Sequence, residues 1–188
     1  MKALLLLVAP VAFAQGLVEG NAQSPVRVLI YEDLQCSDCA EFRKMMDEKL
    51  LPKYGAAVAF EHRDFPLAKH AWARDAAVAS RYFQSVKPAL AIEYRQDTMR
   101  NQSLITRESF EDHLVSFALK KKIDPAKVKA ALAEDRWRKA VDEDLEDGVA
   151  RGIARTPTVL VNGDPFIETI AFEEIARSID AHLAAVKK

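Results

Sequence analysis

Apolar residues recur along the chain at two different spacings, which predict strands and helices in a definite order. A short, β-branched and mostly apolar run at 26–31 predicts a buried strand, and the run at 57–63 predicts a second strand. Between them, apolar positions at helical spacing predict a helix from Cys39 to Tyr54, which is ended by Pro52 and Gly55. A strand–helix–strand unit normally has parallel strands and a right-handed crossover. We therefore expect a β–α–β unit in this part of the chain.

The pattern then stays helical for a long stretch before it returns to strands. Asn162-Gly163 lies between two apolar runs, which is a strong signal for a β-hairpin, and a last helix is expected from Phe172 to Val186. This order of elements predicts an α/β protein with an all-helical insertion. The insertion contains predicted helices at 71–83, 89–100, 109–119, 125–134 and 136–148, and the hairpin contains strands at 158–161 and 165–167.

The chain contains two cysteines, Cys36 and Cys39, which are spaced C-x-x-C between the first predicted strand and the first predicted helix. This position is typical of a redox-active pair. A structural staple is the alternative, but closing so short a loop stabilises a protein by only roughly 2 kcal/mol, less than a crosslink between distant segments. The pair is therefore predicted to carry chemistry.

Residues 1–14 have the features of a secretory signal peptide. They combine a cation at Lys2 with a short apolar run and the small–x–small sequence Ala12-Phe13-Ala14. Cleavage is expected after Ala14, with a site near Ala22 as an alternative, and a buried N-terminal helix or strand is the competing interpretation. Export would place the thiols in the periplasm or another extracytoplasmic compartment, where disulfides form and persist.

Charge and length restrict the remaining possibilities. The 188 residues carry 27 Lys and Arg against 28 Asp and Glu, a formal net charge of −1. This balance argues against nucleic-acid binding, which requires a basic field. The apolar N-terminal run is too short to span a bilayer, and no later run of about 18 apolar residues exists. The length suits one domain, or a small domain with a large insertion.

Three short motifs occur in order: Glu32-Asp33-Leu34-Gln35-Cys36-Ser37-Asp38-Cys39, Arg63-Asp64-Phe65-Pro66-Leu67, and Gly152-Ile153-Ala154-Arg155-Thr156-Pro157-Thr158. Together they resemble the DsbA-like thiol:disulfide oxidoreductases, and the resemblance covers nearly all of the chain after the signal. It implies an α/β, thioredoxin-like fold with an inserted all-helical subdomain. The expected parts are a signal peptide (1–14), an N-terminal half of the thioredoxin fold (24–66), a helical insertion (67–151) and a C-terminal half (152–188).

Two positions depart from the pattern of the family that the chain resembles. The more familiar members carry proline with histidine or tyrosine between the cysteines, where this chain has Ser37 and Asp38. Members of the family often have a buried acid six positions before the first cysteine, where this chain has Ile30. Both departures bear on the strength and direction of the redox reaction.

The positions of the two sulfurs predict their roles. Attack on a disulfide requires a thiolate, which the free N–H groups and the positive dipole end of a helix N-terminus stabilise. Cys36 lies at such a junction and is expected to be the exposed nucleophile. Cys39 follows one helical turn later and is expected to be the buried resolving thiol. Thiol–disulfide exchange through a mixed disulfide is the expected reaction.

The residues around Cys36 are expected to modulate it. The carboxylate of Asp38 disfavours a neighbouring thiolate, so the pKa of Cys36 is expected to be higher, and the couple less oxidising, than in relatives with histidine there. The alternative is that the Asp38 side chain points into water and has little effect on the pKa of Cys36. Arg155 would lower the same pKa if it approached Cys36, but a solvent-facing loop arginine is equally compatible with the sequence. Ser37 belongs to the same modulating set.

Thr156-Pro157 resembles the cis-proline loop of thioredoxin folds. The resemblance implies that the Thr156 backbone faces Cys36 and pairs with an extended client peptide as an added strand. Main-chain pairing tolerates many sequences, so a broad range of clients is expected.

Other candidate residues are expected to be structural. His62 is one of four scattered histidines, none of which has a spacing with the cysteines that suggests a closed metal site. Glu32 and Asp33 are expected to cap the active-site helix or to remain solvated, with one as a candidate proton acceptor for Cys39. Aromatic residues at helical spacing are expected to fill the core of the insertion: Trp72, Phe83, Phe110, Phe117 and Trp137.

The sequence thus predicts an exported thiol:disulfide oxidoreductase that needs no cofactor and is a monomer or weak dimer. The first interpretation is an oxidase that introduces disulfides into reduced secreted proteins and is reoxidised by a quinone-linked membrane partner. The alternative is a reductase or isomerase kept reduced by a different membrane donor. A Cu(I) carrier is a further hypothesis, although the pattern places Met45 and Met46, the nearest extra ligands, on the core side of a helix. A pure peptide-binding module would not need vicinal thiols.

Overall fold

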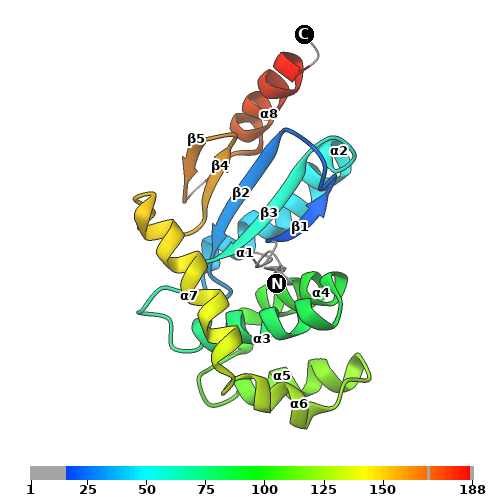
Figure 1. Ribbon diagram of the computed structural model, residues 1–188, viewed down its shortest axis with the longest axis vertical. Helices are drawn as coiled ribbons and strands as arrows, with labels where there is room; N and C mark the ends of the chain where they lie inside the picture. Colours follow the sequence, from blue (N-terminus) through cyan, green and yellow to red (C-terminus); the bar gives the residue numbers. More distant parts are fainter. Residues whose placement is uncertain (1–15, 169, 187–188) are drawn as a thin grey trace, which may run out of the picture.

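The computed structural model describes residues 16–168 and 170–186, and the expected signal peptide lies outside them. At its centre is a five-stranded sheet with the strand order β1–β3–β2–β4–β5 (Figure 1). β2 and β3 are parallel, as expected, and every other neighbouring pair is antiparallel. The strands are β1 (Leu17–Gly20), β2 (Arg27–Glu32), β3 (Ala59–Asp64), β4 (Thr158–Val161) and β5 (Asp164–Ile167).

The sequence pattern does not predict β1. The strand has only four residues, and it directly follows the region taken as a signal peptide, so no alternation is long enough to reveal it. It pairs with the outer edge of β3, where Leu17 lies opposite His62. This pairing brings Glu19 into contact with His62, a contact that the sequence pattern also does not predict.

One face of the sheet is covered by two helical segments. The first runs without interruption through α1 (Ser37–Met45), the π-helical turn η1 (Met46–Leu50) and α2 (Leu51–Tyr54), and the second is α8 (Phe172–Val186). The π turn lies just before Pro52, which has no N–H to continue the helical ladder. Together the segments bury an apolar core made by Val28, Ile30, Phe60, Val159, Val161, Phe42, Met46, Leu50, Ile175 and Ile179.

A block of helices separates β3 from β4 in the sequence and lies below the sheet in Figure 1. An α/β, thioredoxin-like fold with an inserted helical subdomain is therefore confirmed. The exact domain boundaries given above remain predictions. The helices are α3 (Ala73–Val86), α4 (Pro88–Asn101), the 3-10 turn η2 (Gln102–Leu104), α5 (Phe110–Lys120), α6 (Pro125–Ala131) and α7 (Asp135–Ala150).

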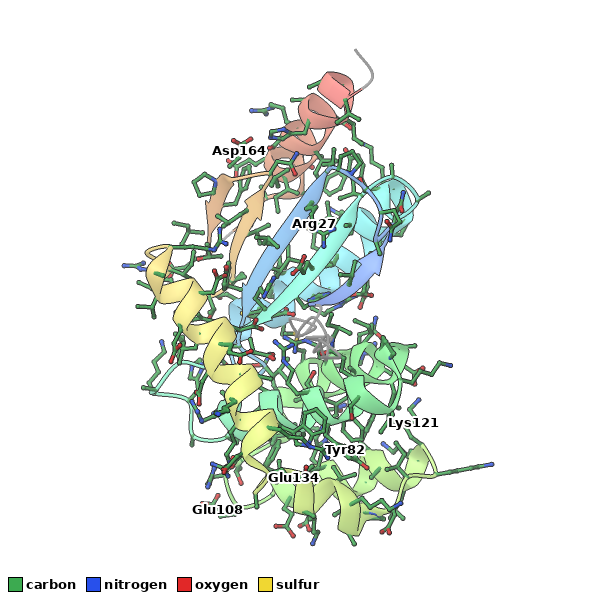
Figure 2. All side chains as sticks on the ribbon, in the orientation of Figure 1. Arg27, Tyr82, Glu108, Lys121, Glu134 and Asp164 are labelled. Atoms are coloured by element: carbon green, nitrogen blue, oxygen red, sulfur yellow. The ribbon has the colours of Figure 1, made fainter. Side chains whose placement is uncertain are left out.

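Aromatic side chains form the core of the insertion, as expected. Trp72 stacks on Phe110 with a centroid distance of 5.7 Å, and Phe83 and Phe117 pack edge to face at 5.2 Å. All four are buried. Trp137 is half-buried at the periphery, where it stands edge-on to Tyr82, labelled in Figure 2. Among the described residues, every helix is too short or too polar to cross a lipid bilayer.

Five buried charged residues join the sheet to the insertion, and we call them the buried ionic cluster: Glu32, Asp64, Arg81, Arg95 and Asp144. Each has an exposed fraction of 6% or less. Arg95, from α4, donates to Asp64 Oδ1 at 2.6 Å and to Glu32 Oε1 at 3.0 Å. Arg81, from α3, donates to Asp64 Oδ2 at 2.6 Å and pairs with Asp144 of α7. The strand ends of β2 and β3 are therefore tied to three helices by charge.

His62 extends this cluster to β1. Its Nδ1 lies 2.5 Å from Glu32 Oε1, and its Nε2 lies 2.8 Å from Glu19 Oε1. Burial opposes charge on all three groups, but their mutual attraction prevails: it raises the pKa of His62 and, with help from Arg95 at Glu32 and Arg43 at Glu19, lowers the pKa of each carboxyl to about 2. His62 therefore acts as a buried cation between two carboxylates, in a structural position.

Candidate active site

Cys36 and Cys39 lie where the start of α1 meets the insertion. Cys36 is the N-cap residue of α1, with φ −81° and ψ 126°, and no side chain in the described part of the protein caps this helix. Both thiols are free and border the apolar core of the insertion. The expectation that Glu32 or Asp33 caps the helix is therefore wrong, and the first-turn N–H groups are left to the Cys36 sulfur.

Asp33 instead holds the turn that precedes the cysteines. Its Oδ1 accepts a hydrogen bond from Gln35 N at 2.7 Å, and its Oδ2 accepts one from Leu67 N at 2.7 Å and lies 2.8 Å from His70 Nδ1. Only 1% of Asp33 and 2% of Glu32 is exposed, so the expectation that they are solvated is wrong as well. Donors from the loop after β3 make burial of the Asp33 carboxylate possible.

The insertion also contacts this turn directly. Gln35 Oε1 accepts a hydrogen bond from Trp72 N at 2.9 Å, and Gln102 Nε2 donates one to the Cys36 carbonyl oxygen at 3.3 Å. These contacts fix the backbone on both sides of the nucleophile. The insertion is thus part of the support of the active site.

The two sulfurs differ in exposure. Cys39 has no exposed surface, as expected of a resolving thiol, whereas 7% of Cys36 is exposed. Cys36 is therefore less exposed than expected, because the loop before β4 packs against it. It nevertheless lines an open hollow of about 570 Å³, together with Ser37, Asp38, Arg155 and Thr156. A client sulfur can approach Cys36 from this hollow and cannot reach Cys39.

Hydrogen bonds stabilise the thiolate of Cys36. Its pKa is lowered to about 6, first by a hydrogen bond from the Cys39 thiol, and then by the Thr156 hydroxyl and the backbone N–H groups of Cys39 and Asp38, while burial opposes the shift. Thr156 Oγ1 is buried and has no hydrogen-bond partner among the described residues, so its hydroxyl is free to donate to a thiolate at Cys36. A substantial fraction of Cys36 is therefore ionised at neutral pH.

Cys39 is held in its neutral form. Burial raises its pKa well above the ordinary value, and the neighbouring Cys36 and the charge of Glu32 raise it further. Its sulfur accepts a hydrogen bond from Asp33 N at 3.4 Å. The pair thus consists of one accessible thiolate and one shielded thiol, which is the arrangement that nucleophilic exchange requires.

The loop before β4 faces the nucleophile. The Thr156–Pro157 peptide bond is cis, and the Cys36 thiol donates to the Thr156 carbonyl oxygen at 3.3 Å. Thr158 Oγ1 donates to Arg155 O at 2.7 Å, and Glu168 N donates to Pro157 O at 2.8 Å, so the loop is fixed at both ends. The Thr156 backbone lies where the resemblance places it, while its pairing with a client remains a prediction.

The remaining modulating residues surround the hollow. Ser37 and Asp38 are exposed, and Asp38 contributes its backbone N–H to Cys36. Arg155 is exposed and donates to Glu168 Oε2 at 2.7 Å, so its charge is engaged by a carboxylate beside the hollow. The effect of the Asp38 and Arg155 charges on redox strength remains a prediction. Within the described part of the chain, no three His, Cys, Asp or Glu side chains are grouped to hold a metal ion.

Alkylation of the reduced protein tests the ionisation of Cys36. The rate with iodoacetamide is expected to rise with pH through a midpoint near 6, instead of the ordinary value of 9.0. Because folding lowers this pKa, ionisation stabilises the reduced folded protein fully above pH 9, and the stabilisation is lost as the pH falls through about 6. Removing the Cys39 donor by Cys39→Ala is expected to raise the midpoint, whereas Cys39→Ser keeps a hydroxyl donor and much of the effect. A midpoint near 9 in the unaltered protein would contradict this assignment.

Comparisons with known proteins agree with this fold. A thioredoxin family model matches residues 14–181 of the chain. The structure is similar to oxidised BdbD from Bacillus subtilis, with a TM-score of 0.76 and 22% identity over 90% of this chain and 93% of that one. It is also similar to α-DsbA1 from Wolbachia pipientis (TM-score 0.78, 17% identity, 96% and 95% covered) and to the catalytic domain of ScsC from Proteus mirabilis (0.72, 20%, 89% and 88%). No curated protein sequence matches the chain.

Proposed function

The chain belongs to the thioredoxin family, and from that premise we propose that it is an exported thiol:disulfide oxidoreductase that acts as an oxidase on secreted proteins. The observation that carries the proposal is the pairing of a Cys36 thiol whose pKa is lowered to about 6 with a fully buried Cys39. Stabilising the thiolate favours the reduced form of the couple, which makes the disulfide form a stronger oxidant.

The proposed reaction oxidises a client dithiol. A client thiolate attacks Cys36 Sγ of the Cys36–Cys39 disulfide, a mixed disulfide forms, and Cys39 leaves as a thiolate that takes up a proton. The second client thiolate then attacks the client sulfur that is bonded to Cys36. This step closes the client disulfide and releases Cys36 as a thiolate. The client loses two electrons and the protein gains them. Reoxidation by a quinone-linked membrane partner would remove them.

The reduction potential of the Cys36–Cys39 pair tests the direction of this reaction. Because of Asp38, equilibration with glutathione buffers is expected to give a value less oxidising than about −120 mV, but closer to that value, which is typical of strong disulfide oxidants, than to about −270 mV. Purified oxidised protein is also expected to introduce disulfides into a reduced, unfolded client in stoichiometric amounts. A potential near about −270 mV, typical of thioredoxin, would favour the reductase or isomerase alternative. If the protein exchanged disulfides with no thiol, both the oxidase and the reductase or isomerase interpretations would be excluded.

A further inference from the structure

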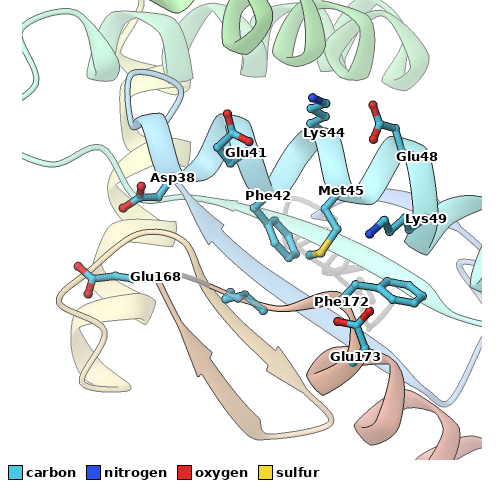
Figure 3. A pocket seen from close by; sticks show the side chains of 11 residues that line it. Asp38, Glu41, Phe42, Lys44, Met45, Glu48, Lys49, Glu168, Phe172 and Glu173 are labelled. Atoms are coloured by element: carbon cyan, nitrogen blue, oxygen red, sulfur yellow. The ribbon is translucent and has the colours of Figure 1, made fainter.

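A groove adjoins the active site on the side of α1 and α8. It has a volume of about 390 Å³ and runs from the Cys36 hollow toward the start of α8 (Figure 3). Asp38 and Glu168 line both the groove and the hollow, so the two cavities are adjacent. A client chain that places its cysteine at Cys36 can therefore continue into the groove.

The floor of the groove is apolar. Phe42 and Met45 point from α1 toward Phe172 in Figure 3, and Ile170 completes this surface. Phe42 is buried, whereas the other three are partly exposed although they pack against the core beneath the sheet. The floor therefore suits apolar side chains of an extended peptide.

The walls of the groove are acidic. Five carboxylates line it against two lysines, Lys44 and Lys49. Lys49 lies 5.5 Å from the ring centroid of Phe172, and Glu168 is engaged by Arg155. In the part of the chain that the structure describes, the other four carboxylates make no ion pair: Asp38, Glu41, Glu48 and Glu173.

The acids also occupy both sides of the groove. In Figure 3, Asp38 lies at the start of α1 with Glu168 across from it, and Glu173 lies beside Phe172. Glu41 and Glu48 stand on the far side of α1, with Lys44 between them. Unpaired charges of one sign beside a low-dielectric floor produce a field that attracts the opposite sign. The negative charge is thus concentrated next to the nucleophile of a chain whose formal net charge is only −1.

We propose that this groove selects clients whose cysteine is flanked by an extended segment of alternating lysine or arginine and apolar side chains. The inference rests on the proposed exchange activity and adds to it a class of substrate. Apolar side chains of the segment would cover Phe42, Met45 and Phe172, and its cations would pair with Glu41, Glu48 and Glu173. Acidic segments are disfavoured by the same carboxylates.

Peptide oxidation tests the proposal. Two reduced dicysteine peptides would be mixed with the oxidised protein, identical except that one cysteine is flanked by Lys-Leu-Lys-Leu or by Glu-Leu-Glu-Leu. Rates would be measured by quenched-flow mass spectrometry, with dithiothreitol as an uncharged reference dithiol. The lysine peptide is expected to react about tenfold faster at low salt, and the ratio is expected to shrink toward one at about 1 M salt.

Matched variants separate the groove from general charge effects. The triple variant Glu41→Gln, Glu48→Gln, Glu173→Gln is expected to lose most of the preference. Its control, Asp112→Asn, Glu143→Gln, Glu146→Gln, removes three exposed carboxylates from the insertion and is expected to keep it. Both are expected to react with dithiothreitol at the rate of the unaltered protein. An equal preference for the lysine peptide in the groove variant and its control would overturn the proposal while leaving the exchange activity intact. If the unaltered oxidised protein did not react with dithiothreitol, the proposed function itself would be overturned.

Discussion

Replacing Cys36 with serine is expected to reduce disulfide transfer to a reduced client to the uncatalysed rate. The Cys36 sulfur is the one that lines the open hollow, and its thiolate is stabilised by Cys39, Thr156 and the first-turn N–H groups of α1. Cys39 cannot substitute for it, because Cys39 has no exposed surface and a raised pKa. The measurement is the appearance of disulfides in an unfolded client, followed by mass spectrometry after acid quenching.

Replacing Cys39 with serine is the informative companion to that experiment. The Cys36 thiolate of this variant attacks one sulfur of a client disulfide and releases the other as a thiolate, but no second thiol is present to resolve the product. A mixed disulfide at Cys36 is expected to accumulate and to be visible as a mass increase.

Ser37→Ala serves as the control with both sulfurs intact. Retention of more than a tenth of the activity by the Cys36→Ser variant would exclude Cys36 as the nucleophile.

Replacing Arg95 with methionine is expected to lower the free energy of unfolding by about 3–5 kcal/mol. Methionine keeps much of the length of the side chain but removes one of the two cations beside each carboxylate, Glu32 and Asp64, both at most 2% exposed. Among the described residues, only His62 then remains beside Glu32, and only Arg81 beside Asp64. Urea denaturation followed by circular dichroism measures the change. At acidic pH, protonation of the two carboxyl groups removes part of the uncompensated buried charge. The loss of unfolding free energy is therefore expected to be smaller at acidic pH than at pH 7.

An exposed ion pair provides the matched control. Arg74 pairs with Asp142 on the surface of the insertion, with 43% and 39% of the two side chains exposed. Arg74→Met is expected to cost about 0–1 kcal/mol. Adding Glu32→Gln to Arg95→Met is expected to recover part of the loss, because one buried charge disappears. A cost below about 1 kcal/mol for Arg95→Met would show that the buried ionic cluster does not hold the two parts of the fold together.

The sequence predicts the elements better than it predicts their contacts. The helix that follows the cysteines and the hairpin at Asn162-Gly163 were predictable because their signals are local: apolar spacing, a turn dipeptide and a C-x-x-C pair. β1 was not predictable from a pattern of four residues. The Thr156–Cys36 contact was available only from the family resemblance, since 120 positions separate the two residues.

The buried ionic cluster was not predictable for a different physical reason. A charged residue on a helix normally marks a solvated face, and only tertiary packing reveals that Arg81 and Arg95 point inward. One signal was present: Arg95 stands on a stripe between Ala91 and Met99, four positions from each, where an apolar residue is expected. The place of Glu32 next to the cysteines predicts a capping or solvated side chain, but Glu32 lies in the interior, and its Oε2 has no partner among the described residues.

The way α3, α4 and α7 meet the strand ends limits how this protein can be shortened. Truncating the helices to obtain a minimal thioredoxin would strip Glu32 and Asp64 of their guanidinium partners and the Cys36 turn of its links to Trp72 and Gln102. Such a miniature would need apolar replacements on β2 and β3 before it could fold. The helical segment is therefore better regarded as an integral half of one cooperative unit than as an accessory that was added to a self-sufficient redox domain.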